Sequence, residues 1–390
     1  MEATTAVVVL AGGTSRRFGS DKLTAPVDGS PLLDAALAAL PGDADVVLVG
    51  PARPTARSVH LVREDPPGGG PAAALVAGLR LALTGPATLL AVLPGDAPAG
   101  GRAAVALLGL LRDDPSASAL VAVDDEGRYQ PLQLALRRPA AEALVASAAD
   151  GGQGASARRL LLAALGPDLR RVPLPPSSLF DVDTPAQLAA WAAQTSPQVA
   201  ALVALAERSS AGDRPVVLAL DGPSGAGKST LAAALRLRTG ATVLPGDDFY
   251  AVAFAESDLE ELGRLDDGEL ADRVFDWARL RAEALVPLAA GRPARYRPFD
   301  WTGTAGPGRL GAARSLPPAP LVVLDGVYAA RPELADLVTA SVLVRAEEIE
   351  RAARLAARGD DPRWAGLWER AERHYFTHVR TAADVDLVLG

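Results

Sequence analysis

Residues 222–230 read Gly222-Pro223-Ser224-Gly225-Ala226-Gly227-Lys228-Ser229-Thr230. They lie between an apolar run and an alanine- and leucine-rich stretch with helical spacing. This fits the pattern Gly-x-x-x-x-Gly-Lys-[Ser/Thr] between a strand and a helix, where backbone N–H groups and the helix N-terminus cradle phosphates. We expect Lys228 to reach the β and γ oxygens of a nucleotide and the Ser229 hydroxyl to bind Mg²⁺. Apart from Pro223, every residue of this loop is a predicted nucleotide-binding residue, and Lys228 is also a predicted catalytic residue.

Two carboxylates and a row of arginines follow in the same half of the chain. Asp247 comes after the next predicted strand, where a carboxylate can accept the proton of a hydroxyl group during phosphoryl transfer from ATP. Asp325 ends another apolar run, and a carboxylate there can bind Mg²⁺ or orient its water. Arg351, Arg354 and Arg358 recur with helical spacing, so their side chains share a face. We expect them to close over the transferring phosphate, the alternative being a solvated arginine face.

Another glycine-rich loop follows the first apolar run of the chain. Because it comes earlier in the sequence, we call it the first glycine-rich loop, and it reads Leu10-Ala11-Gly12-Gly13-Thr14-Ser15-Arg16-Arg17-Phe18-Gly19-Ser20-Asp21-Lys22. Its paired glycines let the backbone approach a ligand closely, and the freed N–H groups can line an anion-binding concavity. Arg17 and Lys22 add cationic donors, and Asp96 follows a later apolar run. Ligands of open α/β sheets bind at the carboxyl ends of strands, and Mg²⁺ prefers one or two carboxylates together with phosphates. The first half is therefore predicted to bind a triphosphate, with Asp96 on the metal.

Lysine is almost absent from this chain. Of the 39 basic residues only Lys22 and Lys228 are lysines, and each lies in one of the two glycine-rich loops. Lysine differs from arginine in being a compact point charge that suits phosphate. We therefore expect each half of the chain to neutralise a polyphosphate with its single ammonium group.

Apolar runs alternate with helical patterns along both halves, which predicts an α/β protein with open, mostly parallel sheets and helices on both faces. The strands are expected at residues 6–10, 45–49, 58–62, 87–93, 119–123, 129–136, 215–220, 242–244, 320–324, 340–344 and 385–389. Breaker-rich segments flank an alanine-rich helix in the middle of the chain. We therefore expect a domain at 1–195, a linker helix at 196–213 and a second domain at 214–390.

Composition excludes several classes of function. The net charge of −8 argues against general nucleic-acid binding, which needs a basic field. There is no cysteine and there are three scattered histidines, so disulfides, thiol nucleophiles and multi-histidine metal centres are not expected. No uninterrupted apolar run is long enough to span a membrane, and the first residues lack a basic signal-peptide region. We expect a cytoplasmic protein with no membrane partner.

The first glycine-rich loop resembles the LAGGxSxRMGxDK signature of the molybdenum cofactor guanylyltransferase-like nucleotidyltransferases, with Phe18 in place of methionine. The similarity runs over about residues 5–195 and includes Asp65 before a GPLAG-type turn, Asp96 in the metal-binding segment, and Asp183 in the NTP segment. The resemblance implies a Rossmann-like sheet in a three-layer α/β/α domain. It implies nucleotide binding by Leu10, Ala11, Gly12, Gly13, Lys22 and Asp65.

The same resemblance implies catalytic roles for Arg17 and Lys22, and Mg²⁺ ligation by Asp96 and Asp183. It implies transfer of a nucleotide from GTP or CTP to a phosphorylated cofactor precursor such as molybdopterin, with release of pyrophosphate. Asp183 replaces the asparagine usual in the guanylyltransferases, and cytidylyltransferase relatives are more similar at this position. Both nucleotides therefore stay open.

Residues 214–390 resemble the uridine kinase-like P-loop kinases. This resemblance implies a second three-layer α/β/α domain that uses ATP, with Asp247 as base, Asp325 on the metal with Ser229, and the arginine helix as a lid. It implies substrate binding by Asp276, Trp277 and Tyr296. The His-Pro pair of the usual FDHP segment is Trp277-Ala278 here, so the acceptor is expected to be a small nucleoside-like hydroxyl compound, and uridine itself does not follow.

Together these patterns predict a bifunctional enzyme, a Mg²⁺-dependent nucleotidyltransferase fused to an ATP-dependent small-molecule kinase. Two alternatives stay open. The second half can instead be a GTP- or ATP-binding accessory module in molybdenum cofactor biosynthesis, or the first half an inactive scaffold. The expected partners are small-molecule substrates, and the oligomeric state is open.

Overall fold

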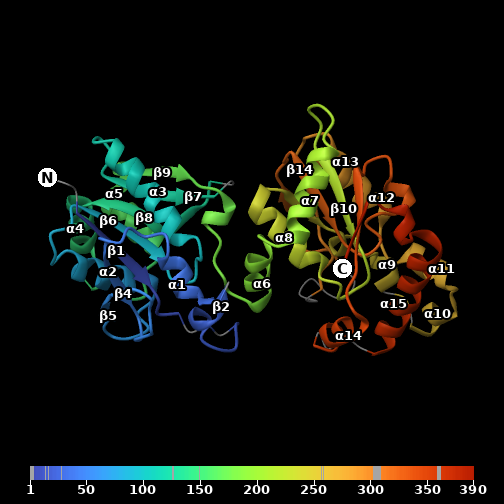
Figure 1. Cartoon of the computed structure of the whole chain (residues 1–390), viewed down its shortest axis with the longest axis horizontal. Coiled ribbons are helices and arrows are strands. Elements are labelled where there is room, and N and C mark those ends of the chain that lie inside the picture. Colours follow the sequence, from blue (N-terminus) through green and yellow to red (C-terminus); the bar gives the residue numbers. More distant parts are fainter. Residues whose placement is uncertain are drawn as a thin grey trace. The chain divides into compact units, whose positions relative to one another are not determined.

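The structure is a computed structural model that describes the chain apart from residues 1–3, 14, 16, 28, 125–126, 149, 256, 258, 302–308 and 358–361. The described residues form two compact units, residues 1–188 and 189–390. Each unit has a central sheet covered by helices (Figure 1), which confirms the predicted α/β class. Among the described helices, none combines the length and the apolar composition needed to cross a bilayer.

The first unit contains a seven-stranded sheet whose strands are mostly parallel. In spatial order they are β5 (His60–Val62), β4 (Asp45–Val49), β1 (Thr5–Leu10), β6 (Leu89–Pro94), β8 (Tyr129–Arg137), β7 (Ala119–Val123) and β9 (Leu169–Pro173). The predicted hairpin of β7 and β8 is present, and β8 inserts antiparallel between β6 and β7. Strand β9 was not predicted, because it is largely exposed at the sheet edge and carries little apolar pattern.

Helices cover both faces of this sheet. One face is covered by α2 (Pro71–Ala82), α4 (Arg138–Ser147) and α5 (Ala157–Leu165), which share a core cluster with Ala6 and Val8 of β1. Side chains alternate along a strand, so Val7 and Val9 face the opposite layer. That layer contains α1 (Leu32–Leu37) and α3 (Gly100–Asp113). The glycine-rich loop thus leaves a strand that is buried on both faces.

The second unit contains a five-stranded sheet in which every neighbouring pair is parallel. In spatial order the strands are β11 (Thr242–Pro245), β14 (Leu321–Asp325), β10 (Val216–Asp221), β15 (Ala340–Val344) and β16 (Leu387–Leu389). Leu218 and Leu220 pack against α7 (Pro197–Arg208) and α8 (Lys228–Thr239). Val217 and Ala219 point to the other face, toward η5 (Leu280–Leu285) and α13 (Val286–Ala289).

The helix expected to be a linker packs into the second unit. Val199 and Leu202 of α7 are fully buried in the same cluster as Leu218. The reason lies in its sequence, because Val199, Leu202 and Leu205 recur every three residues and form an apolar stripe. The division between the units falls at residues 188 and 189, inside α6 (Pro185–Ala193) and ahead of the expected boundary at 195.

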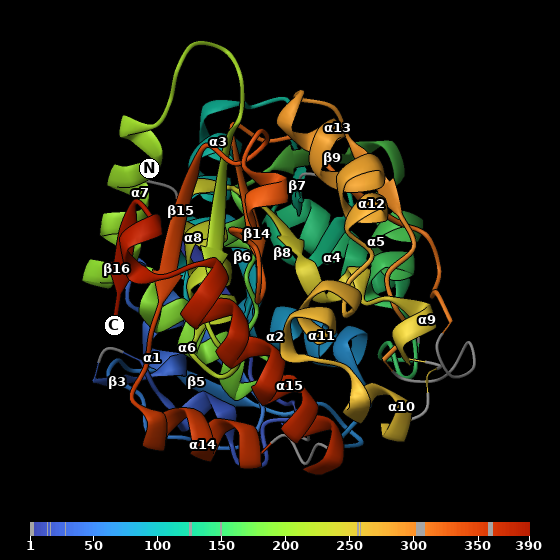
Figure 2. The ribbon, with the colours of Figure 1, turned by 90° about the vertical axis from the view of Figure 1, so that its right-hand side faces the viewer.

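The region between residues 257 and 290 contains several short helical pieces. They are α10 (Leu259–Arg264), α11 (Asp267–Arg273), α12 (Trp277–Arg279), η5 and α13. Asp266 begins α11 with a capping box and Asp276 caps α12, because aspartate favours helix N-termini. A hairpin of β12 (Ala294–Tyr296) and β13 (Arg314–Leu316), which was not predicted, follows. Beyond β15 come α14 (Glu348–Ala356), α15 (Pro362–His374) and η7 (Tyr375–Val379), coloured red in Figure 2.

Replacing Gly78 by alanine should destabilise the first unit, because α2 lies so close to the sheet that no methyl group fits there. A Cβ at Gly78 would overlap Val8 Cγ1 and lie 2.7 Å from Val49 Cγ2. We expect Gly78→Ala to lower the free energy of unfolding by about 1–3 kcal/mol. Gly109→Ala in α3, where nothing lies within 4 Å, should raise it by about 0.5–1 kcal/mol. Chemical denaturation of both variants measures this, and equal stability would contradict the packing described.

Candidate active sites

The first glycine-rich loop is anchored to the carboxyl edge of the first sheet. The N–H of Ala11 donates to the carbonyl of Val49 at the end of β4, at 2.7 Å. The N–H of Gly95, after β6, donates to the carbonyl of Leu10 at 2.9 Å. These bonds place the start of the loop and Asp96 at the same edge, as the sequence predicts for ligands of an open α/β sheet.

Lys22 lies between the two carboxylates that were predicted as metal ligands. Its Nζ is 2.6 Å from Asp96 Oδ2 and 2.7 Å from Asp183 Oδ1, although 161 residues separate Lys22 from Asp183. Lys22 is 7% exposed. Burial lowers its pKa, but the hydrogen bonds to Asp183 and Asp96 outweigh burial and raise the pKa above its usual value. The lysine is therefore charged here and is neutralised by carboxylates.

The donor set of this site fits Mg²⁺ bound together with a triphosphate. Asp96 and Asp183 supply hard oxygen ligands and both stay partly exposed. Among the residues that the structure describes, no group of three or more metal-ligating side chains is gathered to hold a metal unaided. Mg²⁺ characteristically completes such sites with phosphate oxygens and water. Asp96 and Asp183 would hold the ion.

Asp181 is a third carboxylate of this site that the sequence reasoning missed. Burial raises its pKa to about 7, with further contributions from the charges of Asp96 and Asp183. Its Oδ1 is buried without a hydrogen-bond partner. The N–H of Val182 beside it donates to the carbonyl of Asp96 at 2.9 Å, which holds the segment against the loop. Its place two residues before Asp183 on the same extended segment was the available signal.

Two arginines near the first glycine-rich loop differ in exposure and in their contacts. Arg17, predicted to be catalytic, is 80% exposed at its side chain and lies 3.9 Å from Asp183. Arg53, which was not predicted, has an 8% exposed side chain and joins the two ends of the loop. It donates to the carbonyl of Ala11 at 2.7 Å and to Asp21 Oδ2 at 2.7 Å. Arg53 therefore braces the loop, and Arg17 is available to a ligand.

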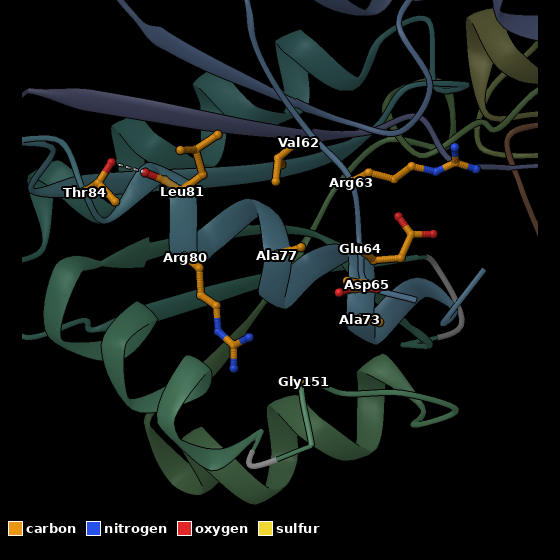
Figure 3. A pocket seen from close by; sticks show the side chains of 10 residues that line it. All are labelled: Val62, Arg63, Glu64, Asp65, Ala73, Ala77, Arg80, Leu81, Thr84 and Gly151. Carbon is orange, nitrogen blue, oxygen red and sulfur yellow. Dashed lines mark hydrogen bonds between the residues drawn. The ribbon is translucent and has the colours of Figure 1, made fainter. Parts of the chain in front are cut away.

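The predicted nucleotide-binding residue Asp65 is exposed, whereas its neighbour Glu64 is 8% exposed and lies beside the loop. Glu64 Oε1 accepts the N–H of Gly68 at 3.0 Å and would lie 3.8 Å from a Cβ on Gly12. Both residues line a pocket of about 380 Å³ along α2. Figure 3 shows Arg80 extending toward Gly151 across this pocket, while the Glu64 carboxylate points away from Ala77.

The second glycine-rich loop, residues 222–230, wraps around Lys228. The Nζ of Lys228 donates to the carbonyls of Gly222 at 2.7 Å and Pro223 at 3.1 Å, and the residue is 7% exposed. Gly222 has φ +144°, and a Cβ there would overlap the carbonyl of Val344, so only glycine fits. Burial lowers the pKa of Lys228, against the charges of Asp325, Asp221, Glu372 and Asp247. The ammonium group is thus held by loop carbonyls, with carboxylates around it.

Asp325 and Ser229 meet at the end of β14. Burial raises the pKa of Asp325 to about 6, against its hydrogen bond with Ser229 and the charge of Lys228, while Asp247 adds to the rise. Asp325 Oδ1 is buried without a hydrogen-bond partner. A hydroxyl, a carboxylate with a free oxygen and a nearby ammonium group fit a Mg²⁺ ion bound with ATP phosphates. Ser229 and Asp325 would hold it, and Asp247 lies exposed at the neighbouring strand end.

The predicted lid arginines contact the loop itself. Arg351 Nε donates to the carbonyl of Ser224 at 3.0 Å, and Arg354 donates to the carbonyl of Gly225 at 2.8 Å. Arg358, the third predicted arginine, lies outside the described residues. The helix α14 thus lies on the phosphate loop.

A buried carboxylate of α15 also accepts hydrogen bonds from this loop, and the sequence analysis did not predict it. Glu372 is 4% exposed and accepts the N–H of Ser224 at 3.1 Å and its hydroxyl proton. The Ser224 hydroxyl in turn accepts the indole N–H of Trp368 at 2.7 Å. Glu372 also lies 3.5 Å from Arg351. Burial raises the pKa of Glu372, against its hydrogen bond with Ser224 and the charge of Lys228.

The three predicted acceptor-binding residues have partners within the fold. Asp276 caps α12 by accepting the N–H of Arg279 at 3.0 Å. Trp277 donates to the carbonyl of Asp272 at 3.2 Å and carries the Arg331 guanidinium over its ring. Tyr296 donates to Asp248 Oδ2 at 2.6 Å.

An aromatic cluster lies beside Asp247 and was not predicted. The ring of Tyr250 has five aromatic neighbours at centroid distances of 4.9–6.3 Å, namely Phe254, Phe275, Phe299, Trp301 and Trp368. Trp301 is 60% exposed, and its indole N–H donates to the carbonyl of Asp247 at 3.3 Å. The cluster therefore connects Asp247, the predicted base, to α15, the helix whose Glu372 accepts hydrogen bonds from Ser224.

Comparison with known proteins assigns the first unit. Residues 7–167 match the family model of the MobA-like NTP transferase domain. The resemblance predicted for the first half of the chain is thus confirmed over these residues, and they form a nucleotidyltransferase-type domain. No curated protein sequence matches the chain.

Several solved structures are similar to this chain, and each covers about half of it. A possible uridine kinase from Bacillus stearothermophilus is 17% identical and covers 50% of this chain and 98% of its own, with a TM-score of 0.39. A molybdopterin-guanine dinucleotide biosynthesis protein A from Archaeoglobus fulgidus is 20% identical over 47% of this chain and 94% of its own, with a TM-score of 0.36. A 2-C-methyl-D-erythritol 4-phosphate cytidylyltransferase from Thermus thermophilus is 21% identical over 48% and 96%, with a TM-score of 0.35.

The buried carboxyl of Asp181 should make the first unit less stable as pH rises. The folded state keeps the proton up to a pKa of about 7, whereas the unfolded state releases it near 3.8. Stability is therefore lost between these values, by at most about 4 kcal/mol, and stays low above pH 7. We expect Asp181→Asn to melt above the wild type at pH 8 and close to it at pH 4, in buffer with EDTA. Asp113→Asn, at an exposed aspartate of α3, is the control; identical pH profiles for Asp181→Asn and the wild type would contradict this assignment.

Proposed function

We propose that the first unit transfers a nucleotide from GTP or CTP to a phosphorylated cofactor precursor, such as molybdopterin, and releases pyrophosphate. The observation that carries the proposal is Lys22, which lies buried between Asp96 and Asp183 at the base of a glycine-rich loop. In the reaction, an oxygen of the acceptor phosphate bonds to the α-phosphorus while the bond to the β-phosphate breaks. The family match of residues 7–167 supports this class of chemistry.

Each residue of this site has a role in the proposed step. The backbone of Gly12 and Gly13 approaches the triphosphate, and Arg17 is exposed enough to reach it. Mg²⁺, when bound, neutralises the triphosphate and polarises the α-phosphate. On binding of the triphosphate, Lys22 would exchange its carboxylate partners for phosphate oxygens, and Asp96 and Asp183 would be the residues that hold Mg²⁺. The charge on Lys22 is therefore needed in both states.

We propose that the second unit transfers the γ-phosphoryl group of ATP to the hydroxyl of a small nucleoside-like acceptor. The support is the convergence of Lys228, Ser229, Asp325 and Asp247 at the ends of three parallel strands. Asp247 accepts the hydroxyl proton, the acceptor oxygen bonds to the γ-phosphorus, and the bond to the bridging oxygen breaks to leave ADP. Both substrates are cytoplasmic metabolites in this proposal, and no nucleic acid or membrane takes part.

The alternative for the second unit is a GTP- or ATP-binding accessory module that performs no phosphoryl transfer. Such a module needs the loop around Lys228 but has no use for a carboxylate such as Asp247 beside the γ-phosphate. The two functions therefore differ in what Asp247 does.

The two lysines provide reciprocal tests of the two nucleotide sites. Loss of a charge-assisted hydrogen bond costs about 1.5–3 kcal/mol, which corresponds to roughly a 10- to 100-fold weaker Kd. We expect Lys22→Ala to weaken binding of Mg-GTP or Mg-CTP to the first unit by this factor and to abolish pyrophosphate release with molybdopterin, while ATP binding to the second unit is unchanged. Lys228→Ala should show the reverse pattern. Isothermal titration of the full chain with each nucleotide measures the two affinities. If each variant lost affinity for both nucleotides equally, the result would contradict separate sites.

Asp247→Asn distinguishes a kinase from an accessory module. We expect it to abolish ADP formation in the presence of a nucleoside panel and to leave the Kd for Mg-ATP within about threefold of wild type, because the base contacts the acceptor and not the phosphates. Asp213→Asn, at an exposed aspartate of the same unit, is the control. Unchanged turnover in Asp247→Asn would reject the kinase assignment.

A further inference from the structure

Asp221, the last residue of β10, is a buried carboxylate that the proposed chemistry does not use. It is 1% exposed and precedes the phosphate loop directly. Its Oδ1 accepts the N–H groups of Gly222 at 2.7 Å and Tyr328 at 2.9 Å. Its Oδ2 accepts the N–H of Ala330 at 3.0 Å and the hydroxyl of Tyr375 at 2.7 Å. Both oxygens are thus doubly occupied by donors.

The four donors come from three separate segments of the second unit. Gly222 begins the phosphate loop, Tyr328 and Ala330 follow β14, and Tyr375 begins η7 after α15. Asp325, the predicted metal ligand, stands only three residues before Tyr328. One carboxylate therefore sets the position of the loop that carries Ser229 relative to the segment that carries Asp325.

Tyr328 adds a reason why this bond is needed. Its φ is +68°, a left-handed conformation that is strained for a residue with a bulky side chain. The side chain is fully buried among Phe275, Trp277, Trp368 and Tyr375. Backbone strain of this kind persists only where the surroundings hold it in place. The bond from the Tyr328 N–H to Asp221 is one such restraint, and it acts on the turn that leaves the metal site.

Charge and shape both matter at this position. A carboxylate can accept four hydrogen bonds, two at each oxygen. Asparagine has the same shape but presents an NH₂ group at one of the two positions. In Asp221→Asn that group would face the N–H of Ala330 or of Gly222 and Tyr328, so at least one backbone donor would lose its acceptor. Such a loss in a buried position shifts the segment that it belonged to.

We propose that Asp221 is a positioning residue for the metal site of the second unit, which holds Ser229 and Asp325 at the separation needed to share one Mg²⁺ with ATP. The proposal rests on the proposed ATP site. It assigns Asp221 a role in how Mg²⁺ strengthens ATP binding, distinct from the binding of the nucleotide itself. A residue that only stabilised the fold would affect ATP binding equally with and without the metal.

The experiment is titration of the full chain with ATP, once with Mg²⁺ and once with EDTA. For each protein we take the ratio of the Kd for ATP in EDTA to the Kd for ATP with Mg²⁺. We expect this ratio to be about tenfold smaller in Asp221→Asn than in the wild type, while the Kd in EDTA stays within about threefold of the wild-type value. Tyr375→Phe removes only the donor from η7, so both affinities should stay within about threefold. The proposal would be overturned if Mg²⁺ increased the ATP affinity of Asp221→Asn as much as that of the wild type, or if Asp221→Asn lost ATP affinity equally in both buffers.

A measurement on the wild-type chain covers the case in which Asp221→Asn does not fold. Hydrogen exchange at the amides of Tyr328 and Ala330 should be slower with Mg-ATP than with ATP and EDTA, because the metal ties Asp325 to the loop that Asp221 holds. No difference between the two conditions would overturn the proposal. If the wild type bound no ATP in either buffer, the proposed ATP site would fail, and this inference with it; ATP binding without a metal effect would reject the inference alone.

Discussion

A buried ammonium group at the carboxyl edge of a parallel sheet is the constraint on which each unit depends. Lys22 and Lys228 are each 7% exposed, and a buried charge is tolerated only where it is paired or hydrogen-bonded. The two units meet this requirement differently. Lys22 is held by two carboxylates and its pKa is raised, whereas Lys228 donates to two loop carbonyls and its pKa is lowered by burial. In the proposed function, Lys22 would therefore exchange its carboxylate partners for phosphate oxygens, whereas Lys228 already lies among the carbonyls of the loop proposed to bind phosphate.

The sequence predicted the parts of both sites that depend on local pattern. The two loops, and Asp96 and Asp325 at strand ends, follow from glycine spacing and from the rule that ligands gather where parallel strands end. The packing of α7 was not predicted, because the helix was expected to be a linker, although its apolar stripe of Val199, Leu202 and Leu205 is local and could have indicated it. Asp276, which stays a predicted acceptor-binding residue, also caps α12, a second role for which an aspartate before a helix is suited.

Two of the residues that were missed, Glu372 and Arg53, reach the sites from far away in the sequence. Glu372 lies 148 residues from Ser224, and Arg53 lies 32 residues from Asp21. Neither residue belongs to a motif. In the sequence, a glutamate on an amphipathic helix or an arginine after a strand cannot be distinguished from an exposed charged residue, and only the fold shows that it is buried. Burial, which the sequence does not show, is what makes these side chains specific. The same holds for Asp221, whose four donors come from three segments.

Arginine and lysine divide the work around both loops in a way that follows from their shapes. Arg53, Arg351 and Arg354 all donate to backbone carbonyls of the loops, which a planar fork with several N–H groups does well while its long stem spans the gap. The ammonium groups instead lie within 2.6–2.7 Å of their nearest partners, which are two carboxylates from outside the loop for Lys22 and the carbonyl of Gly222 for Lys228. A compact ammonium group suits a position that would change partners as phosphates bind, which the proposed function requires of Lys22. In that function, the two lysines of this arginine-rich chain supply the compact charges that face the phosphates, while arginines hold the surrounding backbone in place.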